Sequence, residues 1–148
     1  MTMVNRGFRI SIASDHAGIY LKKFLKEKLK DRGHEVYDLG PDTTDRVDYP
    51  DYANVCCNSI EAGFAELGIL ICGSGIGMSI AANRRTGIRC ALVNEPLSAE
   101  LSRQHNNSNV IAMGARLIGE DMAWKIITTW LTTPFEGGRH EQRIAKLG

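Results

Sequence analysis

The stretch LGILICGSGIGMS, residues 67–79, decides the fold of this chain. Residues Leu67–Cys72 form a run without polar or charged side chains before the cysteine, the pattern of a strand that is buried on both faces of a parallel sheet. Three glycines, Gly73, Gly75 and Gly77, follow at alternate positions. At the carboxyl end of such a strand, glycines let backbone N–H groups approach an anionic oxygen. The stretch therefore predicts an α/β fold whose site binds a small anionic substrate, with Cys72 at its edge.

Strands and helices alternate on both sides of this stretch. Apolar runs predict five strands, at residues 8–14, 34–39, 67–72, 87–93 and 109–113. Helical patterns predict helices at about residues 19–32, 52–63, 78–85, 96–104 and 120–131, before a polar segment at 134–148. Five βα units predict a doubly wound, Rossmann- or flavodoxin-like parallel sheet in a single domain spanning residues 1–148. The flavodoxin-like strand order 2-1-3-4-5 suits five strands, and strands 1 and 3 then flank the switch point.

Composition limits the class of protein. The 148 residues carry 18 Lys and Arg against 17 Asp and Glu, and this balance favours neither a nucleic-acid groove nor a membrane surface. Residues 1–6 contain no apolar core of a signal peptide, and no apolar run approaches the ~18 residues of a membrane span. We therefore expect a soluble, cytoplasmic protein. The charged cluster at residues 22–32 is interpreted as the solvated face of a helix.

The four cysteines do not indicate a disulfide framework, because the chain shows no export signal. Cys56 and Cys57 are adjacent and lack the spacer of a zinc knuckle, and Cys90 lies in an expected strand, where a core position is the simplest interpretation. Only Cys72 has a glycine-rich loop beside it. Its alternative interpretation is that of a small buried hydrophobic residue.

Reactive side chains also follow the first expected strand. Asp15 and His16 come directly after that strand, just as Cys72 and Ser74 come at the end of the third. The two strand ends are neighbours in the expected order, so a carboxylate, an imidazole, a thiol and a hydroxyl converge on one crevice. Each also has a structural interpretation, with Asp15 as a helix cap, His16 as a loop residue and Ser74 as a turn residue.

Two further groups lie away from these strand ends. His105 follows the fourth expected helix, at the opposite end of the sheet, so a functional His105 must serve the site of a neighbouring subunit. A histidine that meets the helix dipole is the alternative. Arg139 and Arg143 are four residues apart and share a face if that segment is helical. Two guanidinium groups can hold a phosphate, although such pairs also occur on plain surfaces.

These residues carry a resemblance to a known family. The motifs, in chain order, are Ser14-Asp15-His16-Ala17-Gly18, Asp48-Tyr49-Pro50-Asp51-Tyr52-Ala53, Cys72-Gly73-Ser74-Gly75-Ile76-Gly77, Ile80-Ala81-Ala82-Asn83, Glu95, Gln104-His105-Asn106, Gly114-Ala115-Arg116 and Gly138-Arg139-His140 with Arg143. Together they closely resemble the type B ribose-5-phosphate isomerases and their sibling sugar-phosphate isomerases, nearly end to end. The resemblance implies an enzyme of the non-oxidative pentose phosphate pathway that interconverts ribose 5-phosphate and ribulose 5-phosphate through an enediolate. It also implies that no metal and no cofactor are needed, and that a homodimer or tetramer shares each active site between subunits.

The resemblance assigns the proton transfer to Cys72. A free thiol is mostly protonated at neutral pH, so the site must favour the thiolate. Relatives that lack this cysteine use a glutamate in the glycine loop, where this chain has Met78. Ser74 and the backbone N–H groups of residues 75–77 would stabilise the enediolate oxygen.

The remaining implied roles concern the ring and the phosphate. His105 from the partner subunit resembles the group that opens the sugar ring, together with Asp15, because an imidazole titrates near neutral pH. The segment 134–148 is expected to contribute phosphate ligands and subunit contacts. The residues implied to bind the substrate are Tyr49, Asn106, Gly73, Gly75 and Gly77 at the sugar, and His16, Arg116, Arg139 and Arg143 at the phosphate.

Three other functions fit parts of the pattern. Sibling enzymes act on allose 6-phosphate or galactose 6-phosphate, and the depth of the sugar pocket, which distinguishes them, does not follow from the sequence. The galactose 6-phosphate enzyme is usually built from two different subunits, whereas this chain carries Asp15, Cys72 and His105 together. A non-catalytic sugar-phosphate or nucleotide sensor would share the fold, but the intact base argues against it. A flavodoxin-type electron carrier would need flavin-stacking aromatic residues after the strands.

Overall fold

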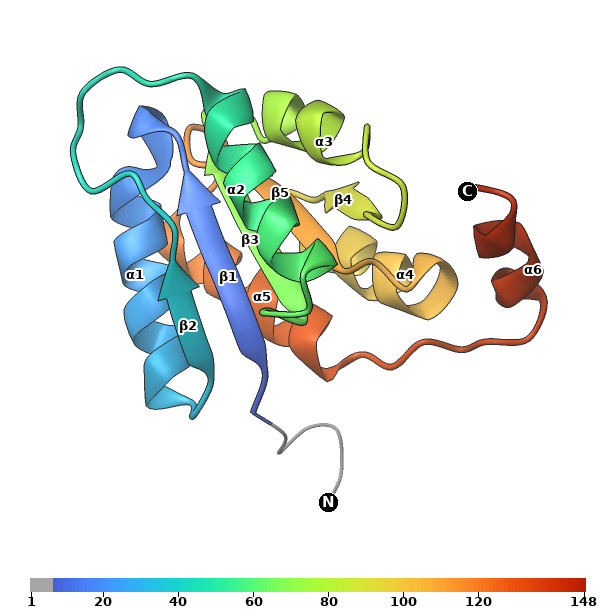
Figure 1. Cartoon of the computed structure of the whole chain (residues 1–148). Coiled ribbons are helices and arrows are strands. Elements are labelled where there is room, and N and C mark those ends of the chain that lie inside the picture. Colours follow the sequence, from blue (N-terminus) through green and yellow to red (C-terminus); the bar gives the residue numbers. More distant parts are fainter. Residues whose placement is uncertain (1–6) are drawn as a thin grey trace.

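The computed structural model describes residues 7–148; residues 1–6, where the sequence predicts no export signal, lie outside the described residues. Helices cover both faces of a five-stranded sheet whose paired strands are all parallel (Figure 1). The strands are β1 (Arg9–Ser14), β2 (Glu35–Asp38), β3 (Leu67–Cys72), β4 (Cys90–Leu92) and β5 (Val110–Gly114). The helices are the 3-10 turn η2 (His16–Gly18), α1 (Ile19–Asp31), α2 (Tyr49–Glu61), α3 (Ile76–Ala82), α4 (Pro96–Asn106), α5 (Glu120–Thr132) and α6 (Arg139–Ala145).

The strand order is β2-β1-β3-β5-β4. The α/β class and the switch point between β1 and β3 are confirmed, but the expected order of the last two strands is wrong. All five residues of β5 are buried, whereas β4 has three residues, of which Leu92 is exposed. A fully buried apolar strand suits the interior of a sheet, and a short, partly exposed one suits its edge. For this reason β5 lies between β3 and β4.

Two apolar clusters hold the helices on the sheet. On one face, buried side chains of α1, α4 and α5, among them Leu25 and Trp130, join a cluster with Ile12 and Ile69 of the sheet. On the other face, α2 and α3 join a second cluster with Ala13 and Leu70. Neighbouring residues of one strand therefore face opposite layers, as the period of a β-strand requires. Among residues 7–148, no helix is both long enough and apolar enough to cross a bilayer.

Three of the cysteines belong to the packing of the second face. Burial raises the pKa of Cys57 to about 11, and it raises the pKa values of Cys56 and Cys90 further above the ordinary range. A thiol that stays protonated is a poor nucleophile, and none of these cysteines forms a disulfide. Cys90 is half-buried rather than fully in the core.

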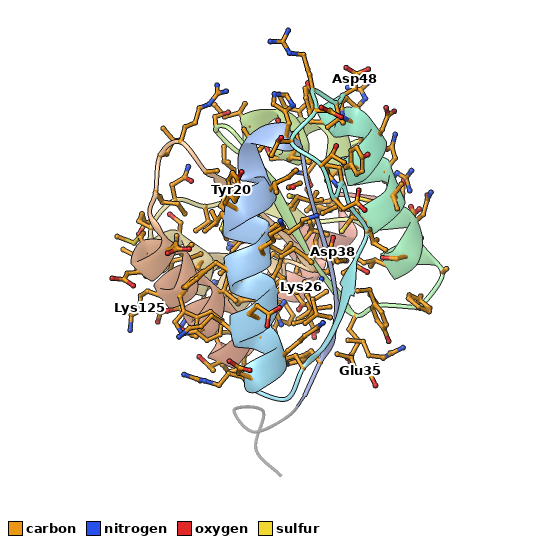
Figure 2. The ribbon with its side chains drawn as sticks, turned by 90° about the vertical axis from the view of Figure 1, so that its left-hand side faces the viewer. Tyr20, Lys26, Glu35, Asp38, Asp48 and Lys125 are labelled. Carbon is orange, nitrogen blue, oxygen red and sulfur yellow. The ribbon has the colours of Figure 1, made fainter. Side chains whose placement is uncertain are left out.

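One lysine of the charged cluster is buried, so the interpretation of residues 22–32 as a solvated face is wrong at this position. Lys22 is 1% exposed, and its Nζ donates to Asp38 Oδ1 at 2.8 Å and to the carbonyl oxygen of Pro41. Lys26 Nζ donates to the other carboxylate oxygen of Asp38 at 3.3 Å. Figure 2 labels both residues, Lys26 on α1 and Asp38 at the end of β2. Burial alone would raise the pKa of Asp38, but the hydrogen bond from Lys22 and its other donors outweigh burial and lower it. Lys22 stands three residues before Leu25, on the buried stripe of the helix, which is the reason for its burial.

Two segments near the site differ from expectation. Helix α2 begins at Tyr49, three residues before the expected start at Tyr52, so Tyr49 lies in its first turn. The polar segment 134–148 contains helix α6, which packs against α4 at the edge of the molecule (Figure 1). These two helices carry Tyr49, Arg139 and Arg143, half of the expected substrate ligands outside the glycine loop.

Candidate active site

The ends of β1 and β3 meet at the carboxyl edge of the sheet. Ser14 pairs with Ile71 in the parallel register, and the N–H of Asp15 donates to the carbonyl oxygen of Ile71 at 3.0 Å. A Cβ on Gly18 would lie 2.9 Å from the same carbonyl oxygen, so the turn after β1 rests directly on β3. Asp15 and Cys72 therefore extend from adjacent strand ends, as the expected switch point requires.

Gly75 turns the chain from β3 into α3. Its φ is +82°, a conformation that residues with a Cβ rarely adopt, and a Cβ there would lie 2.9 Å from the carbonyl carbon of Met113. A Cβ on Gly114 would lie 2.7 Å from the backbone of Ser74. The loop is therefore pressed against the end of β5, which fixes the positions of the side chains it carries.

Cys72 lies at the start of this loop. It is 5% exposed, and its Sγ accepts a hydrogen bond from the N–H of Gly75 at 3.1 Å. Such a contact is stronger to a negatively charged sulfur, so the loop is suited to hold a thiolate. The Oγ of Ser74 accepts from the N–H of Ile76 at 3.2 Å, which leaves its hydroxyl hydrogen to donate elsewhere. Gly77 lies in the first turn of α3, where backbone N–H groups have no partner within the helix.

Tyr49 and Arg116 flank the loop on its two sides. A Cβ on Gly77 would lie 2.7 Å from two ring carbons of Tyr49, and a Cβ on Gly73 would lie 3.4 Å from Arg116 Nη1. Glycine at these positions lets a ring and a guanidinium group lie directly against the backbone. The backbone N–H of Arg116 also donates to the carbonyl oxygen of Gly73 at 3.0 Å. The side chain of Arg116 is exposed, so an anion can approach its guanidinium group.

Asp15 and His16 are held in defined orientations. Oδ1 of Asp15 accepts from the N–H of Ala17 at 2.9 Å, so Asp15 caps the 3-10 turn η2, whereas Gly18 is the N-cap of α1. The second carboxylate oxygen of Asp15 remains for other partners. Nδ1 of His16 accepts from the N–H of Val47 at 3.2 Å. This bond leaves Nε2 of the neutral ring as its donor, aimed away from the segment that leads into α2.

The other predicted residues form a second group, remote from Cys72 in the same chain. Helix α4 begins after the carboxyl end of β4 and runs back to the other edge of the sheet, where the carbonyl oxygen of Asn106 accepts from Arg89 Nε at 2.9 Å. The ring of His140 on α6 stacks on the ring of His105, with centroids 4.6 Å apart. One chain thus brings together Cys72, Ser74, Asp15, His16, Tyr49, Gly73, Gly75, Gly77 and Arg116, and it does not add His105, Asn106, Arg139 or Arg143 to them.

Arg139 and Arg143 lie in α6, which confirms their shared helical face. Both are exposed, and neither forms an ion pair with another described residue. Two guanidinium groups one helical turn apart are left for an anion that a ligand supplies.

Two hollows of the chain lie beside the described site residues. A cavity of about 360 Å³ lies between the α3–β4 connection and α6, and its lining includes Ile88, Asn106 and Leu147. A second hollow of about 470 Å³ lies over the start of α2 and is lined by Val47 and Tyr52 among others. Neither of these two hollows is lined by Cys72.

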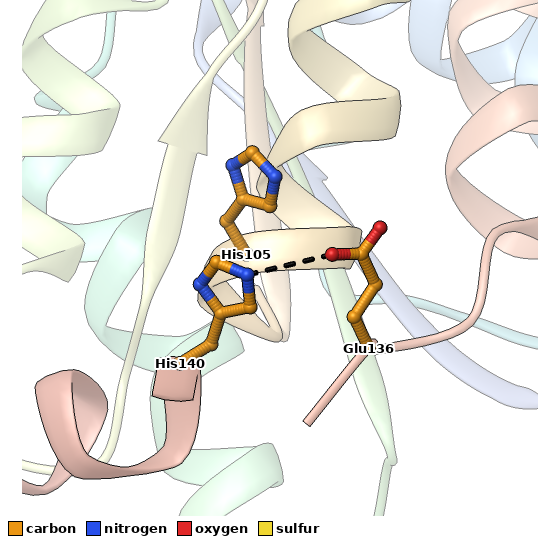
Figure 3. Close-up of side chains that lie close together, drawn as sticks. All are labelled: His105, Glu136 and His140. Carbon is orange, nitrogen blue, oxygen red and sulfur yellow. Dashed lines mark ion pairs between the residues drawn. The ribbon is translucent and has the colours of Figure 1, made fainter. Parts of the chain in front are cut away.

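Sequence reasoning assigned no role to Glu136 or to His140 as an individual residue. Glu136 Oε1 lies 3.4 Å from Nε2 of His140, which in turn stacks on His105 (Figure 3). The spacing of four residues between Glu136 and His140 is the signal that could have found this pair. The surroundings of His105 therefore include two side chains that its own helix does not carry.

Known proteins share both the sequence and the fold of this chain. Residues 10–147 match the model of the Ribose/Galactose Isomerase family. Ribose-5-phosphate isomerase B of Escherichia coli is 46% identical over 139 residues, which cover 94% of this chain and 93% of that protein. The crystal structure of a ribose 5-phosphate isomerase from Thermotoga maritima is 51% identical, with a TM-score of 0.94 over 96% of this chain and 98% of that one. Ribose-5-phosphate isomerase B of Mycoplasma genitalium, solved with bound ribulose-5-phosphate, is 44% identical, with a TM-score of 0.91 over 95% and 93% of the two chains. On this coverage and identity, the chain belongs to the ribose/galactose isomerase family.

Proposed function

We propose that this protein interconverts ribose 5-phosphate and ribulose 5-phosphate in the non-oxidative pentose phosphate pathway. The observation that carries the proposal is the Cys72 thiol beside Asp15, held by the Gly75 N–H at 3.1 Å in a glycine loop at the end of β3. A related enzyme with the same fold was solved with ribulose-5-phosphate bound. The four free cysteines also fit the reducing cytoplasm, where we place the enzyme.

The chemistry needs one base and a set of hydrogen-bond donors. Isomerisation moves a proton between C1 and C2 of the open-chain sugar, so Cys72 as thiolate takes the proton from one carbon and returns it to the other. The intermediate enediolate carries negative charge on oxygen, and the hydroxyl of Ser74 and the N–H of Gly77 are placed to donate to it. Met78 is fully buried and cannot accept a proton, which leaves Cys72 as the base in this loop.

Ring opening needs an acid and a base on the opposite side of the sugar. We assign it to Asp15 of one chain and His105 of a second copy, because His105 lies at the other edge of its own sheet. Apolar side chains that remain exposed on α3, β4 and α4 support a homodimer whose interface includes these three elements. They are Ile76, Ile80, Leu92, Leu97 and Leu101.

The phosphate end of the substrate is assigned to hydrogen-bond donors from both chains. Nε2 of His16 and the guanidinium group of Arg116 lie beside the glycine loop, and Arg139 and Arg143 would arrive on α6 of the second copy. Charge-assisted hydrogen bonds at the phosphate hold the reacting carbons over Cys72, so binding at one end of the sugar serves the chemistry at the other. Tyr49 and the partner's copy of Asn106 would line the sugar between the two ends.

A direct assay tests this function against its alternatives. Purified protein is given ribose 5-phosphate, allose 6-phosphate or galactose 6-phosphate, and formation of each ketose is followed. We expect the highest kcat/KM for ribose 5-phosphate. A higher value for either six-carbon sugar would assign the chain to the sibling activity. The absence of turnover on all three substrates, with binding retained, would favour a sugar-phosphate sensor.

A further inference from the structure

We propose that His105, Glu136 and His140 form a binding site for a divalent transition-metal ion such as Zn²⁺. One donor atom from each of the three side chains lies within 4.8 Å of the other two. Two imidazoles and one carboxylate are a ligand set that zinc adopts in proteins, with a fourth position open to water. Figure 3 shows that a nitrogen of each ring and the Glu136 carboxylate face the same small space.

The distances are close to those that a bound ion requires. The centre of a triangle with sides of 4.8 Å lies about 2.8 Å from each corner, and zinc bonds to nitrogen and oxygen measure about 2.0–2.2 Å. Each ligand atom therefore needs to move by less than about an ångström. The two rings are stacked with 17° between their planes, so one imidazole must also turn to aim its lone pair at the ion.

The backbone holds the three ligands in this neighbourhood. The N–H of Glu136 donates to the carbonyl oxygen of Gln104 at 3.1 Å, next to His105 in the chain. The side chain of His140 is 7% exposed, and Glu136 Oε1 lies 3.4 Å from its Nε2. The three side chains come from α4, the α5–α6 connection and α6, yet a main-chain hydrogen bond and a ring stack already join these segments. Little of the folded chain needs to be rearranged on binding.

The charges around the site have opposing effects. The carboxylate of Glu136 and the carbonyl end of the α4 dipole, one residue beyond His105, favour a cation. Arg139 and Arg143 on α6 oppose it, but both are exposed to solvent, where their repulsion is screened. Neutral imidazoles and one carboxylate leave the ligand set with a charge of −1, which a divalent ion overcompensates.

A metal ion at this position would affect the isomerase, and this consequence depends on the role proposed for His105. An imidazole nitrogen that is bonded to a metal has no lone pair with which to exchange a proton with the sugar ring oxygen. Proton transfer by Cys72 requires no metal, so occupation of the site would inhibit the enzyme rather than activate it.

The binding experiment uses full-length protein freed of metal with a chelator. Zn²⁺ is titrated in competition with a chromophoric chelator, and we expect one Zn²⁺ per chain in the wild type. Glu136→Gln should weaken this binding at least tenfold, because it replaces the anionic ligand of the set. The matched control is Glu141→Gln, an exposed glutamate on α6 next to His140, which should bind as the wild type does. Equal affinity of Glu136→Gln and wild type would overturn the site.

Cobalt distinguishes this site from the cysteines. Co²⁺ bound by imidazole and carboxylate gives visible d–d bands without the thiolate charge-transfer band that cysteine ligands add. We expect a spectrum without that band in the wild type, and we expect it to weaken in Glu136→Gln. A spectrum dominated by thiolate charge transfer, unchanged in Glu136→Gln, would contradict the proposal.

Activity separates the metal site from the catalytic role of His105. Zn²⁺ should inhibit the wild type in step with occupancy, and the inhibition constant should rise in Glu136→Gln by the same factor as the dissociation constant. Inhibition of equal strength in both proteins would place the inhibiting ion at Cys72 and count against the proposal. Binding at the three residues without inhibition would support the metal site and overturn the ring-opening role of His105 instead.

Discussion

A single backbone donor sets the surroundings of the Cys72 sulfur. The backbone nitrogen of Gly75 lies 3.1 Å from Sγ. Gly75 can point its N–H at the sulfur because a φ of +82° is a conformation that glycine adopts without a steric penalty. Burial raises the pKa values of Cys56, Cys57 and Cys90, to about 11 at Cys57. We therefore expect the surroundings of each thiol to determine its reactivity.

Replacing Cys72 by alanine should abolish turnover and leave substrate binding nearly intact, because it removes the group that carries the proton. General bases contribute roughly 10²–10⁴ in rate, so kcat should fall by at least that range. Exchange of solvent deuterium into the substrate carbon, followed by NMR, reports the same step. Cys57→Ala is the control and should retain its activity, since Cys57 packs between α2 and the sheet. A Cys72→Ala enzyme with more than a few per cent of the wild-type rate would refute the assignment.

Gly77→Ala should disturb the sugar site without unfolding the protein. The added Cβ would lie 2.7 Å from the Tyr49 ring, which is 39% exposed and free to move aside. Displacing a positioning group by about an ångström costs up to ~10²-fold, so we expect kcat/KM to fall by tenfold to a hundredfold. Gly119→Ala serves as control, because nothing lies within 4 Å of its Cβ. Steady-state kinetics on both variants, with thermal melts, would check this; equal kinetics would mean that Tyr49 does not line the sugar.

Single residues were predictable from sequence where they follow a strand end. Cys72 and Asp15 were placed correctly because parallel strands bring their carboxyl ends to one edge, whatever the side chains do. Lys22 and Glu136 were not, because their surroundings come from distant segments. The partner of buried Lys22 is Asp38, 16 residues later at the end of β2, and Glu136 lies near His105, which is 31 residues away in the sequence. No local sequence pattern predicts contacts between segments that are this far apart in the chain.

At the scale of the elements, α6 carries two of the residues that we propose bind the phosphate. It is a short helix that begins at Arg139 and packs on α4 (Figure 1), and both of its arginines are exposed. A helix gives the two guanidinium groups a fixed separation that a loop would not. The proposed phosphate site therefore rests on an element that contributes little to the core.

Arg139→Ala and Arg143→Ala should each raise the KM for ribose 5-phosphate. A hydrogen bond to a charged group is worth ~1.5–3 kcal/mol, so the expected increase is about tenfold to a hundredfold. Inorganic phosphate should compete with substrate in the wild type and compete less well in both variants. Gln142→Ala, exposed on the same helix, should leave both constants unchanged. An unchanged phosphate inhibition constant in both arginine variants would show that these arginines do not bind the phosphate.

The ion pair between α1 and β2 should contribute to stability above the ordinary carboxyl titration range. Asp38→Asn removes a charged acceptor from buried Lys22, and because the Asp38 side chain is 23% exposed we expect a loss of about 1–2 kcal/mol at pH 7. The pKa of Asp38 is lowered in the fold, so this contribution is present above its ordinary value of ~3.9 and is lost as pH falls through the folded value.

Urea unfolding at one protein concentration, at pH 7 and pH 3, checks this expectation. The difference between wild type and Asp38→Asn should shrink at the lower pH. Asp42→Asn, exposed in the following loop, should stay within ~0.5 kcal/mol of the wild type at both. A difference as large at pH 3 as at pH 7 would show that the effect is not one of charge.

The identities of the strands and helices followed from the periodicity of apolar residues. The boundaries of the helices and the order of the strands in the sheet were predicted less accurately. All five strands were predicted, because each contains a run of apolar residues. The exchange of β4 and β5 was missed because chain order says nothing about which strand is central; the full burial of β5 decides it. Helix α2 was started too late because Pro50 was not used as a first-turn residue, where proline is favoured.

At the scale of the whole molecule, the residues that we propose form one site lie in two groups at opposite edges of the sheet in a single chain. The thiol, Asp15 and the glycine loop lie at the carboxyl edge, whereas His105 lies at the end of α4, which runs to the other edge. In a closed two-fold dimer, the Cys72 group of each chain would meet the His105 group of the other chain, which gives two complete sites. We therefore expect activity to require association.

Mixed subunits test the shared site directly. A His105→Ala chain and a Cys72→Ala chain should each be nearly inactive alone. Mixed in equal amounts after dissociation, about half of the dimers are hybrids with one intact site of two, so activity should recover to roughly a quarter of wild type. The absence of recovery after proven subunit exchange would place His105 and Cys72 in one chain's site.

The position of β5 has a consequence for the order in which the protein is made. β5 is the partner of β4 and also fills the open side of β3, yet it is the last strand to leave the ribosome. A nascent chain that ends after α4 therefore exposes two unpaired strand edges, and exposed edges of this kind favour aggregation. Residues 110–114 complete the sheet between β3 and β4, so we expect the full sheet to form only after β5 has been synthesised.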